Sequence, residues 1–237
     1  MKRILVSGAT GLIGQAIVKA LLRENEHVIA LVRSIERAES ILGKANRNLE
    51  YIIGDICDIE PKNINVDYII HGASQTSSRA FIEEPIETIT TALLGTKNML
   101  EFARINEVKG FVYLSSMEVY GSPLKDLKID EEHETNLDTM KVRSCYPESK
   151  RMCESLCASY FSEFGVPTKV VRLTQTFGPG VKYNDGRVFA EFARCAIERR
   201  NIVLKTKGET KRSYLYTEDA VNAILTVLYN GISGEAY

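Results

Sequence analysis

The sequence is poor in the features that mark membrane-bound or nucleic-acid-binding chains. Its 237 residues carry a formal net charge of −1, with Lys and Arg scattered rather than clustered, so no basic surface for nucleic acid or an anionic membrane is expected. No apolar run approaches the roughly 20 residues of a membrane span. The chain also enters a strand-like segment at once, without the apolar core of a signal peptide. We therefore expect a cytoplasmic protein with no nucleic-acid partner and no membrane partner.

Cysteine is scarce as well. An odd count without framework spacing is typical of reduced thiols in a cytosolic chain, and the five cysteines are Cys57, Cys145, Cys153, Cys157 and Cys195. Cys153 and Cys157 could share a helix face, but no His or further Cys lies near them in the sequence. No metal site is therefore expected.

A glycine-rich turn near the N-terminus is the clearest functional signal. The apolar run 4–6 is typical of a strand covered on both faces, and helical periodicity begins at Leu12. Between them, Gly8, Gly11 and Gly14 have the spacing G-x-x-G-x-x-G rather than the G-x-G-x-x-G of the ordinary Rossmann fingerprint. Glycines leave backbone N–H groups and a helix N-terminus open to a pyrophosphate; the alternative is an ordinary strand–helix turn. The predicted dinucleotide-binding residues here are Gly8, Thr10, Gly11, Leu12, Ile13 and Gly14.

The end of the next expected strand, 27–32, bears on which nucleotide binds. In NAD-binding proteins an acidic residue about 20 residues past the glycines holds the adenosine ribose, whereas the 2′-phosphate of NADP needs a cation. Here Val32 stands in the place of the acid and Arg33 follows it. We therefore expect NADP rather than NAD as the cofactor; the alternative is that Arg33 is only a solvated loop cation.

Strands and helices alternate along the chain, which predicts an α/β fold with a Rossmann-like, doubly wound parallel sheet. Further strands are expected at 49–56, 66–70, 110–114 and 168–173, and helices at 12–23, 85–106, 146–164 and 218–229.

Two of these strand ends are expected to contact the cofactor. Asp55 and Ile56 close the third strand and could hold an adenine amino group and ring face, although Asp at a strand end is also ordinary turn chemistry. After the fourth strand, Ala73 and Ser74 are small enough for the backbone to pass close beneath a cofactor. His71, just before them, is expected to be a packed side chain rather than a catalyst.

A tyrosine and a lysine open the helix at 146–164, downstream of a strand that ends in serine. Tyr146 and Lys150 are four residues apart and therefore lie on one helical face. An ammonium about 5 Å from the phenol, at an effective dielectric of about 20, favours the phenolate by roughly 3 kcal/mol. This would lower the pKa of Tyr146 from its usual value of about 10. The Y-x-x-x-K pattern is not specific by itself; its position after the fifth strand gives it weight.

Together these motifs resemble the extended short-chain dehydrogenases/reductases, and within them the NAD-dependent epimerase/dehydratase family that modifies nucleotide sugars. The matching segments are Gly8-x-x-Gly11-x-x-Gly14, Gly54-Asp55-Ile56, Gly95-Thr96-x-Asn98, Ser115-Ser116-x-x-Val119-Tyr120-Gly121, Tyr146-x-x-x-Lys150, Phe177-Gly178-Pro179-Gly180 and Arg212-x-Tyr214-x-Tyr216-x-x-Asp219. The resemblance implies that Tyr146 is the catalytic acid/base. It also implies that Lys150 holds the nicotinamide ribose and lowers the pKa of Tyr146, and that Ser116 hydrogen-bonds the reacting sugar oxygen.

The resemblance also implies an organisation for the chain. Residues 1–173 would form the NAD(P)-binding domain. Residues 174–237 would form part of a smaller substrate-binding region interleaved with it, which is expected to be incomplete because family members continue beyond the segment 234–237. Members of the family often dimerise through helices such as 85–106 and 146–164, so a homodimer is a further expectation.

Several positions depart from, or qualify, the family pattern around the substrate. Met117 and Glu118 stand where dehydratases of the family carry an Asp–Glu pair, and a thioether cannot donate a proton, so 4,6-dehydration is disfavoured although Glu118 leaves it open. Gln175 replaces an Asn that commonly touches the sugar diphosphate. Arg212 matches the diphosphate-binding Arg, whose guanidinium fork suits that ligand, with a surface cation as the alternative. The predicted substrate-binding residues are Ser116, Met117, Glu118, Gln175 and Arg212.

The resemblance therefore predicts an NAD(P)-dependent nucleotide-sugar epimerase. Tyr146 would take the proton of a sugar hydroxyl while hydride passes between the sugar carbon and nicotinamide. Three alternatives remain open: an NADPH-dependent ketosugar or carbonyl reductase, a 4,6-dehydratase-like enzyme, and a non-catalytic cofactor-binding protein on the same fold.

Overall fold

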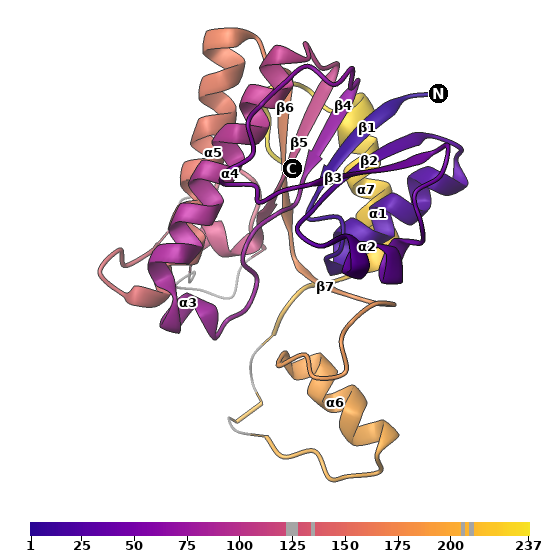
Figure 1. Ribbon diagram of the computed structural model, residues 1–237. Helices are drawn as coiled ribbons and strands as arrows, with labels where there is room; N and C mark the ends of the chain where they lie inside the picture. The colour runs from indigo at the N-terminus through magenta and orange to yellow at the C-terminus, as the bar shows by residue number, and fades with distance from the viewer. Residues whose placement is uncertain (122–127, 134–135, 205–206, 209–210) are drawn as a thin grey trace.

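The protein is built around a parallel β-sheet of six strands, shown in the computed structural model of Figure 1. The structure describes residues 1–237 except 122–127, 134–135, 205–206 and 209–210. The strand order is β3-β2-β1-β4-β5-β6, so the direction of winding reverses between β1 and β4. The strands are β1 (Arg3–Ser7), β2 (His27–Val32), β3 (Leu49–Ile53), β4 (Tyr68–His71), β5 (Gly110–Ser116) and β6 (Thr168–Leu173). This is the predicted doubly wound fold, and the reversal marks the edge where ligands of such sheets bind.

The central strands form because their residues can be buried on both faces. All six residues of β2 are buried, as are Ile4 to Ser7 of β1. In the register of the sheet, Val6 lies between Ala30 of β2 and Ile70 of β4. Short runs of β-branched residues without polar alternation are what a sheet covered by helices on both sides requires.

Helices cover both faces of the sheet (Figure 1). On one face lie α1 (Leu12–Arg23), α2 (Ile35–Leu42) and α7 (Thr217–Asn230), and on the other lie α4 (Pro85–Ile105) and α5 (Cys145–Phe164). Helix α4 starts with Pro85 in its first turn, where a missing N–H costs nothing. Helix α5 ends at Gly165, which adopts the left-handed conformation with φ of 70°.

The part of the chain after β6 divides between the sheet and an arm. A small two-stranded sheet of β7 (Gln175–Phe177) and β8 (Tyr214–Tyr216), with α6 (Val188–Ile197), extends away from the main body in Figure 1. Helix α7 returns to the main sheet and packs beside α1. The last residues then run parallel to β6, where the Val170 N–H donates to the Glu235 carbonyl at 3.0 Å. Residues after β6 thus divide between the arm and the main sheet.

Candidate active site

The glycine turn closes so tightly that only glycine fits. Gly8 has a φ of 69°, and a Cβ on it would lie 2.7 Å from the backbone nitrogen of Ala73. A Cβ on Gly14 would lie 2.1 Å from the carbonyl oxygen of Gly8. Gly11 caps α1 with no side-chain hydrogen bond, and no acidic residue occupies the first helical turn. The first N–H groups of α1 are therefore left for an anion, so this turn fits the pyrophosphate of a dinucleotide.

The other residues predicted for the turn lie around this helix start. Gly11 is exposed, while Thr10, Leu12 and Ile13 are half-buried. The loop after β7 reaches the same place, because a Cβ on Gly180 would come within 2.7 Å of the Gln15 side chain at the start of α1. The segment 178–180, which belongs to another motif in the sequence, thus borders the glycine turn.

The predicted adenine-side residues are placed less uniformly. Arg33 is exposed at the end of β2, and its guanidinium makes no hydrogen bond or ion pair with the residues that the structure describes. Strand β3 ends at Ile53, earlier than predicted, because Asp55 begins a turn in which its Oδ1 accepts the Cys57 N–H at 2.9 Å. Ile56 is only 7% exposed and packs on Gly95 of α4. The core thus takes most of the Ile56 side chain, and Asp55 is half-buried beside it; that the two hold an adenine stays a prediction.

The loop after β4 runs directly against the glycine turn. The Ala73 N–H donates to Ser7 Oγ at 3.3 Å, and Ser74 is half-buried next to it. Ala73 and Ser74 thus lie where the sequence placed them, beside the backbone that would face a cofactor.

The three predicted catalytic residues come together at the carboxyl end of β5. Ser116 is the last residue of β5, and its side chain hydrogen-bonds the phenol of Tyr146. Tyr146 and Lys150 lie in the first turns of α5, are 9% and 3% exposed, and the Lys150 Nζ is 5.8 Å from the centre of the Tyr146 ring. A phenol, a hydroxyl and a buried amine therefore share one corner of the sheet edge.

The electrostatics of this corner differ from the prediction. Burial raises the pKa of Tyr146 to about 12, although the Ser116 hydrogen bond and the Arg143 charge act to lower this pKa. Burial also lowers the pKa of Lys150 to about 8. The Lys150 ammonium donates to the Leu114 carbonyl at 2.8 Å and lies 4.8 Å from the centre of the Tyr113 ring. The expected lowering of the Tyr146 pKa by Lys150 is thus not found, because desolvation of the phenol outweighs the neighbouring charges.

Two side chains that the sequence did not single out cover Tyr146. Phe81, on the short helix α3 (Ala80–Glu83), stacks on the Tyr146 ring with centroids 4.3 Å apart. The guanidinium carbon of Arg143, in the 3₁₀ turn η2 (Val142–Ser144), lies 4.6 Å from the Phe81 ring centre and 5.9 Å from that of Tyr146. The signal for Arg143 was its position three residues before Tyr146; nothing in the sequence pointed to Phe81.

Arg143 is held by a residue that was predicted to bind substrate. Its Nη2 contacts both carboxylate oxygens of Glu118, at 3.0 and 2.8 Å. Glu118 lies in the 3₁₀ turn η1 (Met117–Tyr120), and its backbone N–H donates to Ser116 Oγ at 3.2 Å, so Ser116 starts this turn. Met117 is half-buried in the same turn. Ser116, Glu118, Arg143 and Tyr146 thus form one connected group.

The other two predicted substrate residues lie on the β7–β8 arm. Gln175 opens β7, and its buried Oε1 has no hydrogen-bond partner among the described residues. Arg212 is exposed two residues before Tyr214, which pairs with Gln175, and its side chain contacts only the Lys211 carbonyl in the part of the chain that the structure describes. No hydrogen bond or ion pair links either residue to Ser116 or Tyr146 within those described ranges. The structure therefore places them together on the arm and apart from the catalytic group.

A buried chain of neutral hydrogen bonds joins the glycine turn to α5. Ser7 Oγ is 2.7 Å from His71 Nδ1, His71 Nε2 is 3.0 Å from Thr96 Oγ1, and the Thr96 hydroxyl donates to Cys153 Sγ at 3.2 Å. The Cys153 thiol donates onward to the Ala92 carbonyl. Because the Thr96 hydroxyl gives its proton to Cys153, Thr96 Oγ1 can only accept a hydrogen bond from His71. The imidazole proton of His71 is therefore on Nε2, and Nδ1 accepts a hydrogen bond from the Ser7 hydroxyl. Burial lowers the pKa of His71 to about 3, and the imidazole is a neutral, packed group as predicted.

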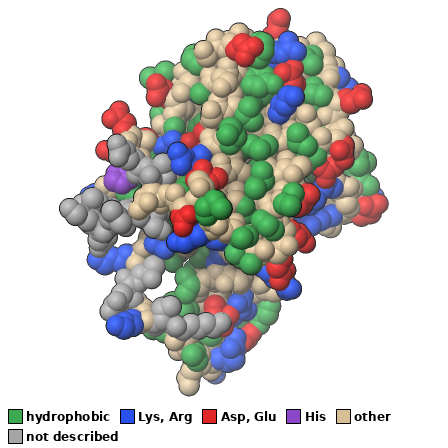
Figure 2. Space-filling model, turned by 90° about the vertical axis from the view of Figure 1, so that its left-hand side faces the viewer, with side chains coloured by type: hydrophobic (Ala, Val, Ile, Leu, Met, Phe, Trp, Pro, Cys, Tyr) green, Lys and Arg blue, Asp and Glu red, His purple; other side chains and the backbone are tan. Residues whose placement is uncertain are grey.

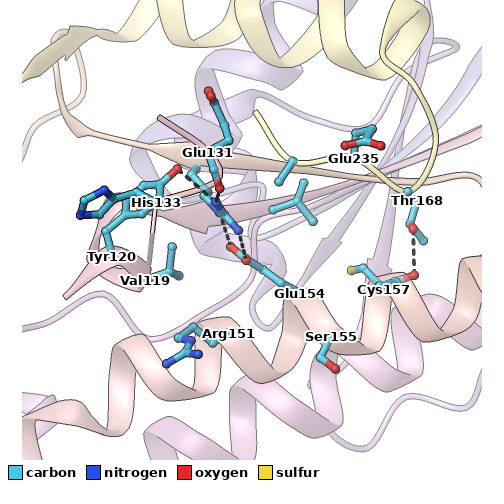
Figure 3. A pocket seen from close by; sticks show the side chains of 15 residues that line it. Val119, Tyr120, Glu131, His133, Arg151, Glu154, Ser155, Cys157, Thr168 and Glu235 are labelled. Atoms are coloured by element: carbon cyan, nitrogen blue, oxygen red, sulfur yellow. Dashed lines mark hydrogen bonds and ion pairs between the residues drawn. The ribbon is translucent and has the colours of Figure 1, made fainter. Parts of the chain in front are cut away.

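A separate hollow of about 380 Å³ lies at the β6 edge of the sheet (Figure 3). One wall of this hollow is formed by an ion pair between Arg172 and Glu154, with an Nη2–Oε2 distance of 2.8 Å. Arg172 also donates to the Tyr120 hydroxyl at 3.1 Å, and Glu154 accepts from Ser115 at 2.5 Å. These bonds fix both ends of the segment 115–120, which carries Ser116 and Glu118.

Two further features concern the described part of the chain. Within it, no group of three or more His, Cys, Asp or Glu side chains is arranged to hold a metal ion. None of its helices is both long enough and apolar enough to cross a membrane.

Comparison with known proteins agrees with this architecture. The model of the NAD dependent epimerase/dehydratase family matches residues 4–237. Among curated proteins, UDP-glucuronic acid decarboxylase 1 of Xenopus tropicalis is 32% identical over 98% of this chain, and UDP-glucuronic acid decarboxylase 3 of Arabidopsis thaliana is 32% identical over 98%. The chain spans 55% of the first relative's length and 68% of the second's.

Solved structures share the fold at lower identity. The structure of UDP-glucose 4-epimerase of Thermotoga maritima with UDP-glucose has a TM-score of 0.84 to this chain at 24% sequence identity. The match covers 99% of this chain and 75% of the epimerase chain. UDP-glucuronic acid 4-epimerase of Bacillus cereus, with UDP-glucuronic acid and NAD, is 22% identical with a TM-score of 0.82, covering 99% and 76%. At these identities the likeness shows the fold.

Proposed function

We propose that this chain, which belongs to the NAD-dependent epimerase/dehydratase family, oxidises a hydroxyl-bearing carbon of a nucleotide-linked sugar with Tyr146 as the acid/base group. The observation that carries the proposal is the joining of Ser116, Tyr146 and Lys150 at the carboxyl end of β5. Beside them lies a glycine turn whose free N–H groups suit a pyrophosphate. A bound nicotinamide dinucleotide would supply the hydride acceptor of this oxidation.

The residues of the chain would handle the proton. The phenolate of Tyr146 accepts the proton of the sugar hydroxyl, and the Ser116 hydroxyl, already bonded to the phenol, orients the sugar oxygen. Lys150 supplies a positive charge that stabilises the phenolate once the site is closed from water. Because burial holds the pKa of Tyr146 near 12, the reaction needs the charge of Lys150 to make the phenolate accessible.

For the overall reaction we favour decarboxylation of a nucleotide-linked uronic acid. The curated relatives at 31–32% identity are UDP-glucuronic acid decarboxylases. Oxidation next to the carbon that carries the carboxylate gives a β-keto acid. Its carbon–carbon bond then breaks, CO₂ leaves, and the electron pair moves to the ketone oxygen to give an enolate. Protonation of the enolate carbon restores the ketone, and return of the hydride to that ketone would give the nucleotide-linked pentose. The epimerisation predicted from the sequence is the second candidate, since it begins with the same proton transfer and returns hydride to the other face of the ketone.

The test is to incubate the chain with UDP-glucuronic acid and each nicotinamide nucleotide and to follow the sugar by NMR. A nucleotide pentose with one equivalent of CO₂ supports decarboxylation, and a C4 epimer supports epimerisation. Absence of both binding and turnover would reject the proposed function.

For the cofactor we propose NADP over NAD, on the evidence of the exposed, unpaired Arg33 at the end of β2. Arg33→Ala should weaken NADP binding by about tenfold or more, because a charged hydrogen bond to the 2′-phosphate is worth roughly 1.5–3 kcal/mol, and should leave NAD binding unchanged. Calorimetric titration of both nucleotides decides this. Tighter binding of NAD than NADP by the unaltered protein would overturn it; the Bacillus cereus structure was solved with NAD.

We also propose a homodimer through the face formed by α4 and α5. Figure 2 views this side of the molecule and shows hydrophobic side chains gathered on it. They include Ile86, Ile89, Leu94 and Ile105 of α4 and Met152, Phe161 and Phe164 of α5, all at least 36% exposed. A two-fold axis would bring this patch onto itself. Leu94→Glu should yield monomers in sedimentation velocity, whereas Ile197→Glu on the arm helix α6 should leave the dimer intact. If the unaltered protein is a monomer at all concentrations, the proposed dimer is rejected.

A further inference from the structure

The ion pair between Arg143 and Glu118 beside Tyr146 has a feature that a purely structural pair does not need. Only one nitrogen of the guanidinium, Nη2, engages Glu118. The Nε and Nη1 groups have no hydrogen-bond partner among the described residues, and the side chain is 37% exposed. A guanidinium presents its donors in a fixed fork that matches a carboxylate, so this one retains an edge able to take a second anion.

The position of this edge relative to the reacting group is restricted. The guanidinium carbon is 5.9 Å from the centre of the Tyr146 ring and 4.6 Å from the Phe81 ring, which stacks on Tyr146. The sugar hydroxyl that gives its proton to Tyr146 must lie at the phenolic oxygen. In a uronic acid, the carboxylate is attached to the ring carbon next to the one that bears this hydroxyl. The nearness of Arg143 to the Tyr146 ring makes its guanidinium the candidate partner for an anion carried there.

We infer that Arg143 is a specificity-determining residue that recognises the carboxylate of a nucleotide-linked uronic acid, and that Glu118 occupies it until the substrate binds. This rests on the proposed function and goes beyond it by naming the group that distinguishes a uronic acid from a neutral hexose. Glu118 keeps the cation oriented on the ring face of Phe81, and the substrate carboxylate competes with it for the fork. A neutral hydroxymethyl group at the same place offers no charge and leaves the Glu118 pair intact.

The contact would act mainly on binding. The carboxylate is negatively charged before the sugar is oxidised, so an interaction with Arg143 is present in the ground state and is carried into the transition state. Uniform binding of this kind changes KM and leaves kcat little altered. Glu118 opposes the binding of the substrate carboxylate, because the carboxylate must displace Glu118 from Arg143.

The experiment compares UDP-glucuronic acid with UDP-glucose on the full chain saturated with nicotinamide nucleotide. The unaltered protein should bind UDP-glucuronic acid more tightly. Arg143→Ala should weaken UDP-glucuronic acid binding by 10- to 100-fold and leave UDP-glucose binding within twofold, and Arg143→Lys should fall between. Glu118→Gln should tighten UDP-glucuronic acid binding. Arg151→Ala is the matched control. Arg151 pairs with Glu148 within α5, so this variant removes the same charge at another place.

The outcomes separate this inference from the proposed function. If the protein binds UDP-glucuronic acid but Arg143→Ala does not change the affinity, or weakens both sugars equally, the role of Arg143 is overturned and the proposed function stands. If the unaltered protein binds neither sugar, both are overturned. Should Arg143→Ala lower the thermal midpoint by leaving Glu118 unpaired, the double variant with Glu118→Gln repeats the comparison without that unpaired charge.

Discussion

The ring of Phe81 lies nearly parallel to the ring of Tyr146, with an interplanar angle of 17° and 4.3 Å between their centroids. Phe81 comes from a four-residue helix, and it is 2% exposed. The contact removes water from one face of the phenol, and burial is the main cause of the raised Tyr146 pKa. A residue far from Tyr146 in the sequence thus contributes to the burial of its phenol.

Replacing Phe81 by Ala should move the activity to lower pH. The oxidation requires the phenolate, so the rate rises with pH up to the pKa of Tyr146; rehydration of the phenol lowers that pKa from about 12. The rise of kcat/KM with pH should level off at least one pH unit lower in Phe81→Ala. Phe164→Ala, which removes a ring packed on Tyr160 instead, should leave the profile in place. Identical profiles for Phe81→Ala and the unaltered protein would contradict this account.

Removal of the Tyr146 hydroxyl should abolish turnover and spare cofactor binding. In Tyr146→Phe, the ring and its stacking on Phe81 remain, but no group at that place accepts the sugar proton, so kcat should fall by about a thousandfold or more. Cofactor affinity, measured by calorimetry, should stay within a few fold. Tyr160→Phe in the same helix breaks a hydrogen bond to Glu101 and should retain activity. Turnover retained by Tyr146→Phe would remove Tyr146 from the mechanism.

Lys150 should make the stability of the protein depend on alkaline pH. Its pKa is about 8 in the folded state against 10.5 when solvated, so between these values the unfolded chain binds more protons and stability rises with pH. Relative to Lys150→Met, the unaltered protein should gain on the order of 3 kcal/mol in free energy of unfolding as pH rises from 7.5 to 10.5. Urea unfolding of both proteins at each pH measures the difference. A constant difference would mean that Lys150 does not titrate in this range.

Gly14→Ala should prevent cofactor binding. The new methyl group would lie 2.1 Å from the Gly8 carbonyl oxygen, so the turn must open and the N–H groups of α1 lose their alignment. Nucleotide affinity, followed by fluorescence of the reduced cofactor, should fall by about a hundredfold or more, since several hydrogen bonds to the pyrophosphate are lost together. Gly186→Ala is the control because no atom of the described residues lies within 4 Å of its added methyl. Normal binding by Gly14→Ala would show that the turn does not hold the pyrophosphate.

The sequence predicted the elements whose side chains repeat with a clear period. The bounds of α1, β2 and β6 agree with the prediction because each has a continuous apolar run or stripe ended by a charged or turn-forming residue. The β7–β8 pair was missed because three-residue strands are too short to show alternation, and the ten-residue helix α6 was missed as well. The extent to which a residue is buried could not be predicted either: Ile56, expected beside the cofactor, has most of its side chain in the core.

The candidate site divides in the same way. Ser116, Tyr146 and Lys150 could be assigned because they belong to a pattern, and the structure brings them together. Phe81 and Arg143 could not, because their roles arise from a stacking contact between α3 and α5 and from an ion pair with Glu118, both of which depend on tertiary packing. The pKa of Tyr146 was misjudged for a related reason: the charge of Lys150 could be read from the sequence, but the loss of water around the phenol could not.

The hydrogen-bond chain from Ser7 through His71 and Thr96 to Cys153 contains no ion. It ties the strand before the glycine turn to the helix that carries Tyr146 without placing a fixed charge beneath the dinucleotide, where a cation or an anion would bias the binding of phosphates or nicotinamide. Added salt screens charges but does not weaken a buried neutral bond. The connection between the two halves of the site should therefore persist at ionic strengths that weaken the contacts of Arg33 and Arg143 with their anions.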